Sequence, residues 1–234
     1  MIGNKRKLER AVNLIIVLFL GFFLISMNEI DNLENSPISG GIDVQFLKKG
    51  SAARSGVKLD DVQDIVIHYV GNPGSTAQQN RDYFNNPDSR VSSHFIIGMD
   101  GKIIQAIPLD ERSAATNWRN NDTISIELCH PDETGKLTQE TYDSLIWLSS
   151  WLIDKFDLEV DNIIRHYDVT GKHCPLYFVE HEDKWVQFKE DVRNYHKNRK
   201  PLFYEFGSTQ KSVIDLEGLN DEDRKLMLGR GFPT

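Results

Sequence analysis

A histidine and a cysteine lie close together in residues 165–175, and both side chains are common metal ligands. His166 comes just after residues 160–164 (VDNII), which we expect to form a short buried strand, and Cys174 follows a loop that contains Gly171. Imidazole and thiolate groups suit a borderline-soft metal such as zinc. Their spacing is too long for one face of a helix, so we expect the loop to curl back and bring them together. Two ligands are a weak signal, and the rest of the chain must supply a third.

His68 is the candidate for the third ligand. It stands near the end of a β-branched run at 65–70, which predicts a strand, and the sequence GNPG at 71–74 predicts a loop directly after it. Site residues often occupy such strand ends, although a histidine that only caps the sheet shows the same pattern. With His166 and Cys174 it would give three protein ligands and an open position, as in catalytic zinc sites.

Two charged residues could act beside such a metal. Glu127 lies within a predicted strand at 123–129, on the face opposite its alternating apolar residues. That face is either a site or solvated, and the pattern alone leaves both open. A carboxylate there could take a proton from water or give one to a leaving nitrogen. Lys172, two residues before Cys174, could stabilise a developing oxyanion. Together these groups would suffice for metal-assisted hydrolysis of an amide.

The elements that must position these residues alternate between strands and helices. Residues 94–107 predict a hairpin, in which Asp100 and Gly101 suit a two-residue turn because both positions need positive φ. Ser75 and Thr138 are the expected N-caps of the first two predicted helices. The predicted helices cover about 76–84, 138–156 and 183–197. This order predicts an α/β fold, a single catalytic domain with a mixed central sheet flanked by helices.

The N-terminal part contains an apolar run at 11–27 with basic residues before it and acidic residues after it. This charge order places the N-terminus in the cytoplasm and the later residues outside. At about 1.5 Å per residue the run just crosses a thin bilayer core. We predict a transmembrane anchor, because no small-x-small cleavage pattern lies near Met27, with a cleaved signal sequence as the alternative. The working domain is then in the cell envelope, outside the cytoplasmic membrane, or secreted.

Length, charge and cysteine content bound the remaining possibilities. The 234 residues suffice for one domain with extensions, and the net charge of −8 argues against nucleic acid as a partner. Cys129 and Cys174 are too few for a disulfide framework, and a disulfide between them would remove Cys174 as a ligand. The predicted organisation begins with a cytoplasmic basic segment (1–10), an anchor or signal sequence (11–27) and a linker (28–41). A catalytic domain (42–200) and an extension of unassigned role (201–234) follow.

Four segments together resemble the zinc N-acetylmuramoyl-L-alanine amidases, the family of amidase-type phage lysozymes and peptidoglycan-recognition proteins. In family order they are IVIHY at 65–69, SHFIIGMDG at 93–101, ISIEL at 124–128 and RHYDVTGKHCP at 165–175. The resemblance implies that one zinc ion is held by His68, His166 and Cys174. It also implies that Glu127 and Lys172 are catalytic. The implied reaction is hydrolysis, by a zinc-activated water, of the amide between N-acetylmuramic acid and L-alanine in peptidoglycan.

The chain departs from the family pattern at two places. Ser93 stands where the phage lysozyme branch has a tyrosine, which leaves Glu127 as the catalytic partner. Thr116 and Asn117 stand where many relatives carry a histidine that touches substrate, so contacts there are open. We assign substrate contacts to four residues: Asn72, His94, Asn117 and His173. The alternatives are a structural role for His94 and a solvated position for His173.

Two other functions are compatible with the resemblance. A peptidoglycan-recognition module would bind without cutting, but such modules usually lack the cysteine ligand, and Cys174 is retained. A recycling amidase that acts on anhydromuropeptides inside the cell would not need the export segment at 11–27. The expected partners are peptidoglycan or muropeptides, together with the membrane through residues 11–27. We expect a monomer that does not bind nucleic acid.

Overall fold

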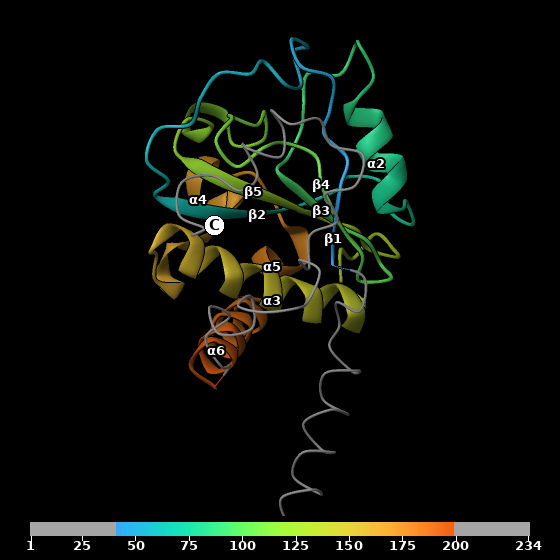
Figure 1. Cartoon of the computed structure of the whole chain (residues 1–234). Helices are drawn as coiled ribbons and strands as arrows, with labels where there is room; N and C mark the ends of the chain where they lie inside the picture. The colour runs from blue at the N-terminus through green and yellow to red at the C-terminus, as the bar shows by residue number, and fades with distance from the viewer. Residues whose placement is uncertain (1–40, 199–234) are drawn as a thin grey trace, which may run out of the picture. The chain divides into compact units, whose positions relative to one another are not determined.

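A mixed sheet of six strands forms the centre of the computed structural model, which describes residues 41–198 (Figure 1). The strands are β1 (Ile42–Val44), β2 (Asp64–Tyr69), β3 (Phe95–Ile97), β4 (Ile103–Gln105), β5 (Thr123–Leu128) and β6 (Ile163–Arg165). Their order in the sheet is β1-β4-β3-β5-β2-β6. Strands β3, β5, β2 and β6 are parallel to one another, whereas β4 is antiparallel to β3 and parallel to β1. The predicted mixed sheet is confirmed.

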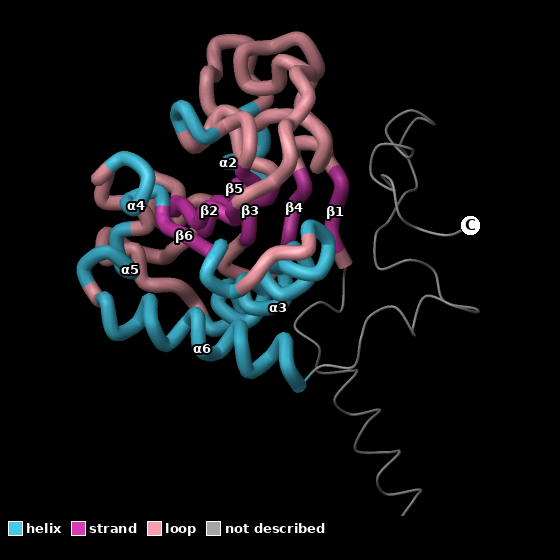
Figure 2. Tube along the Cα trace, turned by 90° about the vertical axis from the view of Figure 1, so that its left-hand side faces the viewer, coloured by secondary structure: helices cyan, strands magenta, loops and turns pink. Residues whose placement is uncertain are grey.

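Helices cover both faces of this sheet, as predicted. They are α2 (Ala77–Phe84), α3 (Gln139–Phe156), α4 (His166–Thr170), α5 (Leu176–Glu180) and α6 (Glu182–Asn198), with short 3₁₀ turns at Asn117–Arg119 and Val160–Asn162. Figure 2 shows α3 and α6 on one side of the sheet and α2 on the other. The central strands are therefore shielded on both faces, as is usual for parallel strands.

The alternation along β5 decides which side chains face which layer. The ring of Phe95 meets Trp151 of α3 edge-on, with centroids 6.4 Å apart. Phe95 is the register partner of Ile126, so this face of β5 lies over α3. Glu127 must then point to the opposite face, and its register partner His68 on β2 points the same way. The polar pair thus avoids the apolar core under α3.

Two predicted turns and caps differ from the structure. The hairpin of β3 and β4 exists, but Gly101, with φ of 77°, is left-handed and Asp100 is not. The Gly101 amide bonds to the Gly98 carbonyl at 3.0 Å, so the connection is a three-residue loop with glycine at its left-handed position. The predicted two-residue turn is wrong. At α2 the N-cap is Thr76, which forms a capping box with Gln79, and not Ser75.

The segment around the candidate ligands is also more helical than predicted. We expected residues 160–164 to form a strand. Instead Val160–Asn162 form a 3₁₀ turn, and only Ile163–Arg165 form β6. The following loop contains the short helix α4. Helix α3 has the predicted cap, since Thr138 accepts a hydrogen bond from the Thr141 amide. Strand β1 and helix α5 had no clear sequence signal.

Several predicted segments lie outside the described residues. These are the segments at 1–10 and 11–27, nearly all of the linker at 28–41, and the extension at 201–234. Within residues 41–198, none of the helices is both long and apolar enough to cross a bilayer.

A buried ion pair ties the loops beside the sheet together. Arg54 donates to both carboxylate oxygens of Glu111, at 2.8 and 3.0 Å, and to the Leu47 carbonyl at 2.9 Å. The side chains of the pair are 5% and 0% exposed. The Glu111 carbonyl in turn accepts a hydrogen bond from His94 at 2.9 Å. Burial raises the pKa of Glu111, but the hydrogen bonds and charge of Arg54 outweigh it, so the pKa lies below its ordinary value.

We predict that Glu111→Gln lowers the free energy of unfolding by about 3–5 kcal/mol, because the buried charge of Arg54 loses the carboxylate that it bonds to twice. Urea unfolding at pH 7 measures the change. The double variant Arg54→Met/Glu111→Leu is the control and should recover most of the loss, since it removes both charges. A loss below about 1 kcal/mol in the single variant would contradict a buried, mutually dependent pair.

Candidate functional site

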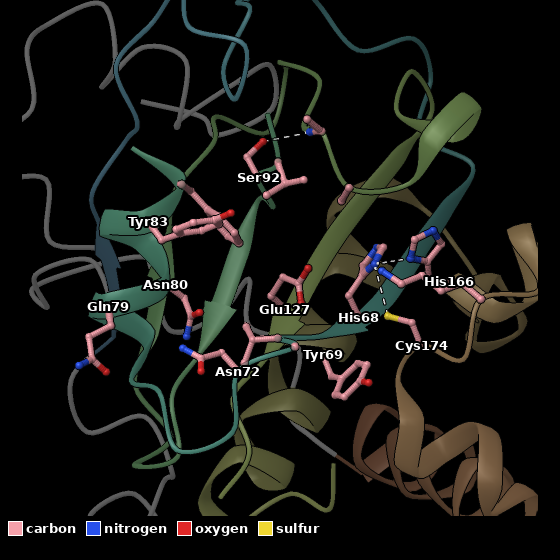
Figure 3. A pocket seen from close by; sticks show the side chains of 17 residues that line it. His68, Tyr69, Asn72, Gln79, Asn80, Tyr83, Ser92, Glu127, His166 and Cys174 are labelled. Carbon is pink, nitrogen blue, oxygen red and sulfur yellow. Dashed lines mark hydrogen bonds between the residues drawn. The ribbon is translucent and has the colours of Figure 1, made fainter. Parts of the chain in front are cut away.

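The carboxyl ends of three parallel strands place the candidate residues at one edge of the sheet (Figure 3). His68 is the penultimate residue of β2, and Glu127 is its register partner on β5. His166 comes directly after β6, where it begins α4. Parallel strands end at the same sheet edge, and this is the usual place for ligands in α/β folds. The sheet therefore brings together residues far apart in the sequence.

Two imidazoles and a thiol converge at this edge. Ligand atoms of His68, His166 and Cys174 all lie within 4.8 Å of one another. The two Nδ1 atoms are 3.1 Å apart, and the cysteine Sγ is 3.9 Å from the Nδ1 of His68. Around a tetrahedral zinc with bonds of about 2.0–2.3 Å, neighbouring ligand atoms lie roughly 3.3–3.7 Å apart. The donor set and its spacing therefore suit zinc.

The loop that brings Cys174 back to the histidines is short and turns sharply. Helix α4 ends at Gly171, whose φ of 75° is left-handed and favours glycine. The Cys174 carbonyl then accepts a hydrogen bond from the Tyr167 amide at 2.9 Å. The side chains of His68, His166 and Cys174 are nearly inaccessible, at residue exposures of 2%, 5% and 1%. The curl that the spacing required is present.

Burial also sets the protonation of the three groups. It lowers the pKa of His68 well below the ordinary value, with His166 and Lys172 adding to the effect, and it lowers the pKa of His166. Burial raises the pKa of the Cys174 thiol to about 12, and Glu127 adds to this. Neutral imidazoles are ready to bind a metal, whereas the thiol must lose its proton to do so.

A cavity of about 530 Å³ opens over these residues. The three candidate ligands lie at one end, and Glu127 lies between them and the side chains of α2 and nearby loops at the other end (Figure 3). Those side chains include Asn72, Gln79, Asn80, Tyr83 and Ser92, and Lys172 also lines the cavity. The volume is in the range of small-molecule sites. The sequence analysis missed the contribution of α2 to the cavity wall. The signal was present, because polar residues at spacings of three and four come after the loop predicted at 71–74.

Glu127 is unusual because one of its carboxylate oxygens is buried without a hydrogen-bond donor among the described residues. This oxygen is Oε2. Burial raises the pKa of Glu127 to about 7, against the opposing charge of Lys172. A carboxyl group with this pKa can both hold and release a proton near neutral pH, which general acid–base catalysis requires.

The four residues assigned to substrate contacts have different surroundings. Asn72 lines the cavity, whereas His173 is exposed and packs its ring near that of Tyr167. Asn117 contacts His166, with its Oδ1 3.1 Å from Nε2. His94 is fully buried below the cavity and bonds through both ring nitrogens, to Ser125 and to the Glu111 carbonyl. His94 therefore has no surface to offer a substrate, and the structural alternative describes it better.

Comparison with known proteins identifies the family to which this fold and site belong. The chain belongs to the N-acetylmuramoyl-L-alanine amidase family, whose family model matches residues 58–176. The predicted family is thereby confirmed.

Individual relatives carry the same description. The chain is 32% identical over 169 residues to N-acetylmuramoyl-L-alanine amidase BlyA of Bacillus subtilis (strain 168), covering 63% of this chain and 46% of BlyA. The solved catalytic domain of XlyA has a TM-score of 0.58 and 25% identity, covering 64% of this chain and 98% of that structure. A solved mutant endolysin from Bacillus subtilis has a TM-score of 0.57 and 26% identity, covering 64% and 97%. The chain spans about half the length of the curated relatives it matches.

We predict that the Glu127 carboxyl titrates with a midpoint of about 7 in the metal-free protein. Side-chain ¹³C NMR of glutamate-labelled protein measures it, with Glu127→Gln to assign the signal. Lys172→Met should raise the midpoint further, because it removes a charge that favours the carboxylate, and Lys172→Arg should leave it unchanged. A midpoint near the ordinary glutamate value would contradict a desolvated carboxyl group.

Proposed function

We propose that this protein hydrolyses the amide bond between N-acetylmuramic acid and L-alanine in peptidoglycan, with one zinc ion held by His68, His166 and Cys174. The observation that carries the proposal is the convergence of two imidazole nitrogens and a thiol within 4.8 Å, at the end of a cavity that also contains Glu127. Membership of the amidase family supplies the reaction class.

His68, His166 and Cys174 would hold the metal beside the cavity. When bound, zinc would supply a lowered pKa for water and polarisation of the scissile carbonyl. The protein's own task is to hold the substrate amide in the cavity and to move protons. The buried setting of His68, His166 and Cys174 supports this role because it fixes their geometry before substrate arrives.

Glu127 is the proposed proton carrier. With a pKa of about 7, a substantial fraction of the carboxyl group is ionised at neutral pH and can accept a proton from water. The same group can then deliver that proton to the alanine nitrogen as the amide breaks. The unpaired Oε2 supports this assignment, because a purely structural buried carboxylate would be expected to have a hydrogen-bond donor.

Lys172 is the proposed source of positive charge for the oxyanion. Its side chain is exposed at the cavity, and its charge influences both Glu127 and His68. A cation there can favour the negative charge that develops on the carbonyl oxygen during attack. Asn72, on the cavity wall, is a proposed substrate contact.

The substrate implies a location outside the cytoplasm. The predicted export segment at 11–27 would place the catalytic domain, proposed as 42–200, on the outer side of the cytoplasmic membrane. This assignment rests on the charge pattern of the sequence, and it applies equally to an anchored and a secreted form.

We predict that the purified protein releases new alanine amino termini from peptidoglycan, without new reducing sugar ends, and that a zinc chelator stops the release. Glu127→Gln should lower the rate by about 10²–10⁴-fold, because the proton carrier is lost while the side-chain shape is kept. Amine labelling and mass spectrometry of the products measure both effects. Glu111→Gln, assayed where it remains folded, controls for loss of stability.

The same assay separates the competing functions. Tight binding to peptidoglycan without release would favour a recognition module over an enzyme. Cleavage of anhydromuropeptides but not of intact peptidoglycan would favour a recycling amidase. The chain has 33% identity over 89 residues to 1,6-anhydro-N-acetylmuramyl-L-alanine amidase AmpD of Salmonella typhimurium, covering 35% of this chain and 47% of AmpD.

A further inference from the structure

A surface loop at 114–122 contacts the far side of both candidate histidine ligands. Each imidazole directs Nδ1 toward the other and has its second nitrogen, Nε2, beside a side chain of this loop. The Nε2 of His68 lies 3.2 Å from the Thr116 hydroxyl, and the Nε2 of His166 lies 3.1 Å from the Asn117 Oδ1. Two consecutive residues therefore contact the two histidines one each.

The contact with Asn117 fixes the tautomer of His166. An amide oxygen can only accept a hydrogen bond, so the hydrogen must be on Nε2 of His166. A neutral imidazole carries one hydrogen, which leaves Nδ1 with a free lone pair. This lone pair points toward the Nδ1 of His68, which is 3.1 Å away.

Thr116 completes the arrangement at His68. The Thr116 side chain is fully buried, and its hydroxyl can accept a hydrogen bond from the Nε2 of His68 or donate one to it. Thr116 therefore holds the ring of His68 in place with either tautomer. When a cation lies between the two rings, both hydrogens are on Nε2 and both Nδ1 lone pairs point at the cation. Without a cation, His68 can carry its hydrogen on Nδ1 and donate it to the Nδ1 of His166 at 3.1 Å.

The backbone of the loop is held in a conformation that favours this contact. Asn117 has a φ of 54°, in the left-handed region that residues with a Cβ seldom adopt, although asparagine tolerates it better than most. The Asn120 side chain accepts hydrogen bonds from the amides of Ala115 and Thr116, at 3.0 and 2.6 Å. Such strain persists only where the surroundings enforce it.

Ion pairs anchor the end of the same loop to the sheet. Arg119 bonds to Asp122 at 2.8 Å and to Asp64, the first residue of β2, at 2.7 Å. The Thr123 hydroxyl donates to the Arg119 carbonyl at 2.6 Å. The loop is therefore fixed to β2, the strand that carries His68, and to β5, the strand that carries Glu127.

From these contacts we propose that Thr116 and Asn117 are positioning residues that pre-form the metal site. Asn117 holds His166 in the Nε2–H tautomer, and Thr116 holds the ring of His68 in the orientation that directs its Nδ1 at the same point. The proposal rests on the proposed zinc site. It also gives a role to Thr116 and Asn117, which stand where many relatives carry a histidine. Fixing the second nitrogen of a metal-binding histidine sets both its tautomer and its ring orientation.

Zinc affinity, measured by competition with a chromophoric chelator at constant pH, tests the proposal. Asn117→Gly keeps the left-handed backbone but removes the acceptor, and Thr116→Val keeps the shape but removes the hydroxyl. Each should weaken zinc binding by about 10–100-fold. Asn117→Asp and Thr116→Ser keep an acceptor and should retain wild-type affinity. Circular dichroism of each metal-free variant confirms that it is folded.

Unchanged affinity in folded Asn117→Gly and Thr116→Val would overturn the proposal. So would an equal loss in the matched variants that keep the acceptor, because that would indicate a purely steric role for the loop.

The histidine tautomers of the metal-free wild-type protein give a second readout that needs neither zinc nor a variant. Long-range ¹H–¹⁵N NMR should show hydrogen on Nε2 of His166, and hydrogen on Nδ1 of His166 would overturn the proposal. If His166 is Nε2–H but the wild type binds no zinc, the proposed zinc site fails, while the positioning role of Asn117 is supported.

Discussion

The site depends on one constraint: two imidazole nitrogens 3.1 Å apart and a thiol nearby, all on side chains with little access to solvent. A cation at this point would join the three donor groups, so the cluster supports the proposed metal site. The parallel register of β2 and β5, together with the end of β6, supplies the geometry. The sharp turn at Gly171 returns the chain so that Cys174 reaches the same point.

Desolvation at this edge affects Glu127 as well as the candidate ligands. The same burial that keeps His68 neutral raises the pKa of Glu127 to about 7, so one environment suits both the proposed metal site and the proposed proton carrier. Lys172 opposes the rise in the pKa of Glu127 without restoring its ordinary value. The exposed position of Lys172 lets its charge act at the cavity while the carboxyl group stays buried. The balance between burial and one nearby cation thus tunes the proposed chemistry.

Much of this arrangement could be predicted from the sequence because it depends on local patterns. The β-branched run before His68 and the alternation around Glu127 predicted two strands that the structure contains. The hairpin turn was mispredicted because Asp-Gly is compatible with more than one loop length, and packing against α3 is not visible in a short segment. Gly101 lies so close to α3 that an added Cβ would be 3.0 Å from the Glu140 carbonyl oxygen.

Other features could not be predicted because they arise from contacts between distant segments. His94 has the sequence context of a site residue, yet its bonds to Ser125 and the Glu111 carbonyl bury it. Thr116 and Asn117 carry no motif, and their relation to the histidines depends on how the loop is anchored to β2. The part played by α2 in the cavity likewise depends on the layer it occupies.

X-ray absorption at the zinc edge of the purified protein tests the central claim most directly. We expect one zinc per chain, with two nitrogen ligands and one sulfur ligand at about 2.0–2.3 Å. Cys174→Asp should lose the sulfur contribution while the protein remains folded. Bound zinc without a sulfur ligand in the wild type, or folded protein that binds no zinc, would contradict the site formed by His68, His166 and Cys174.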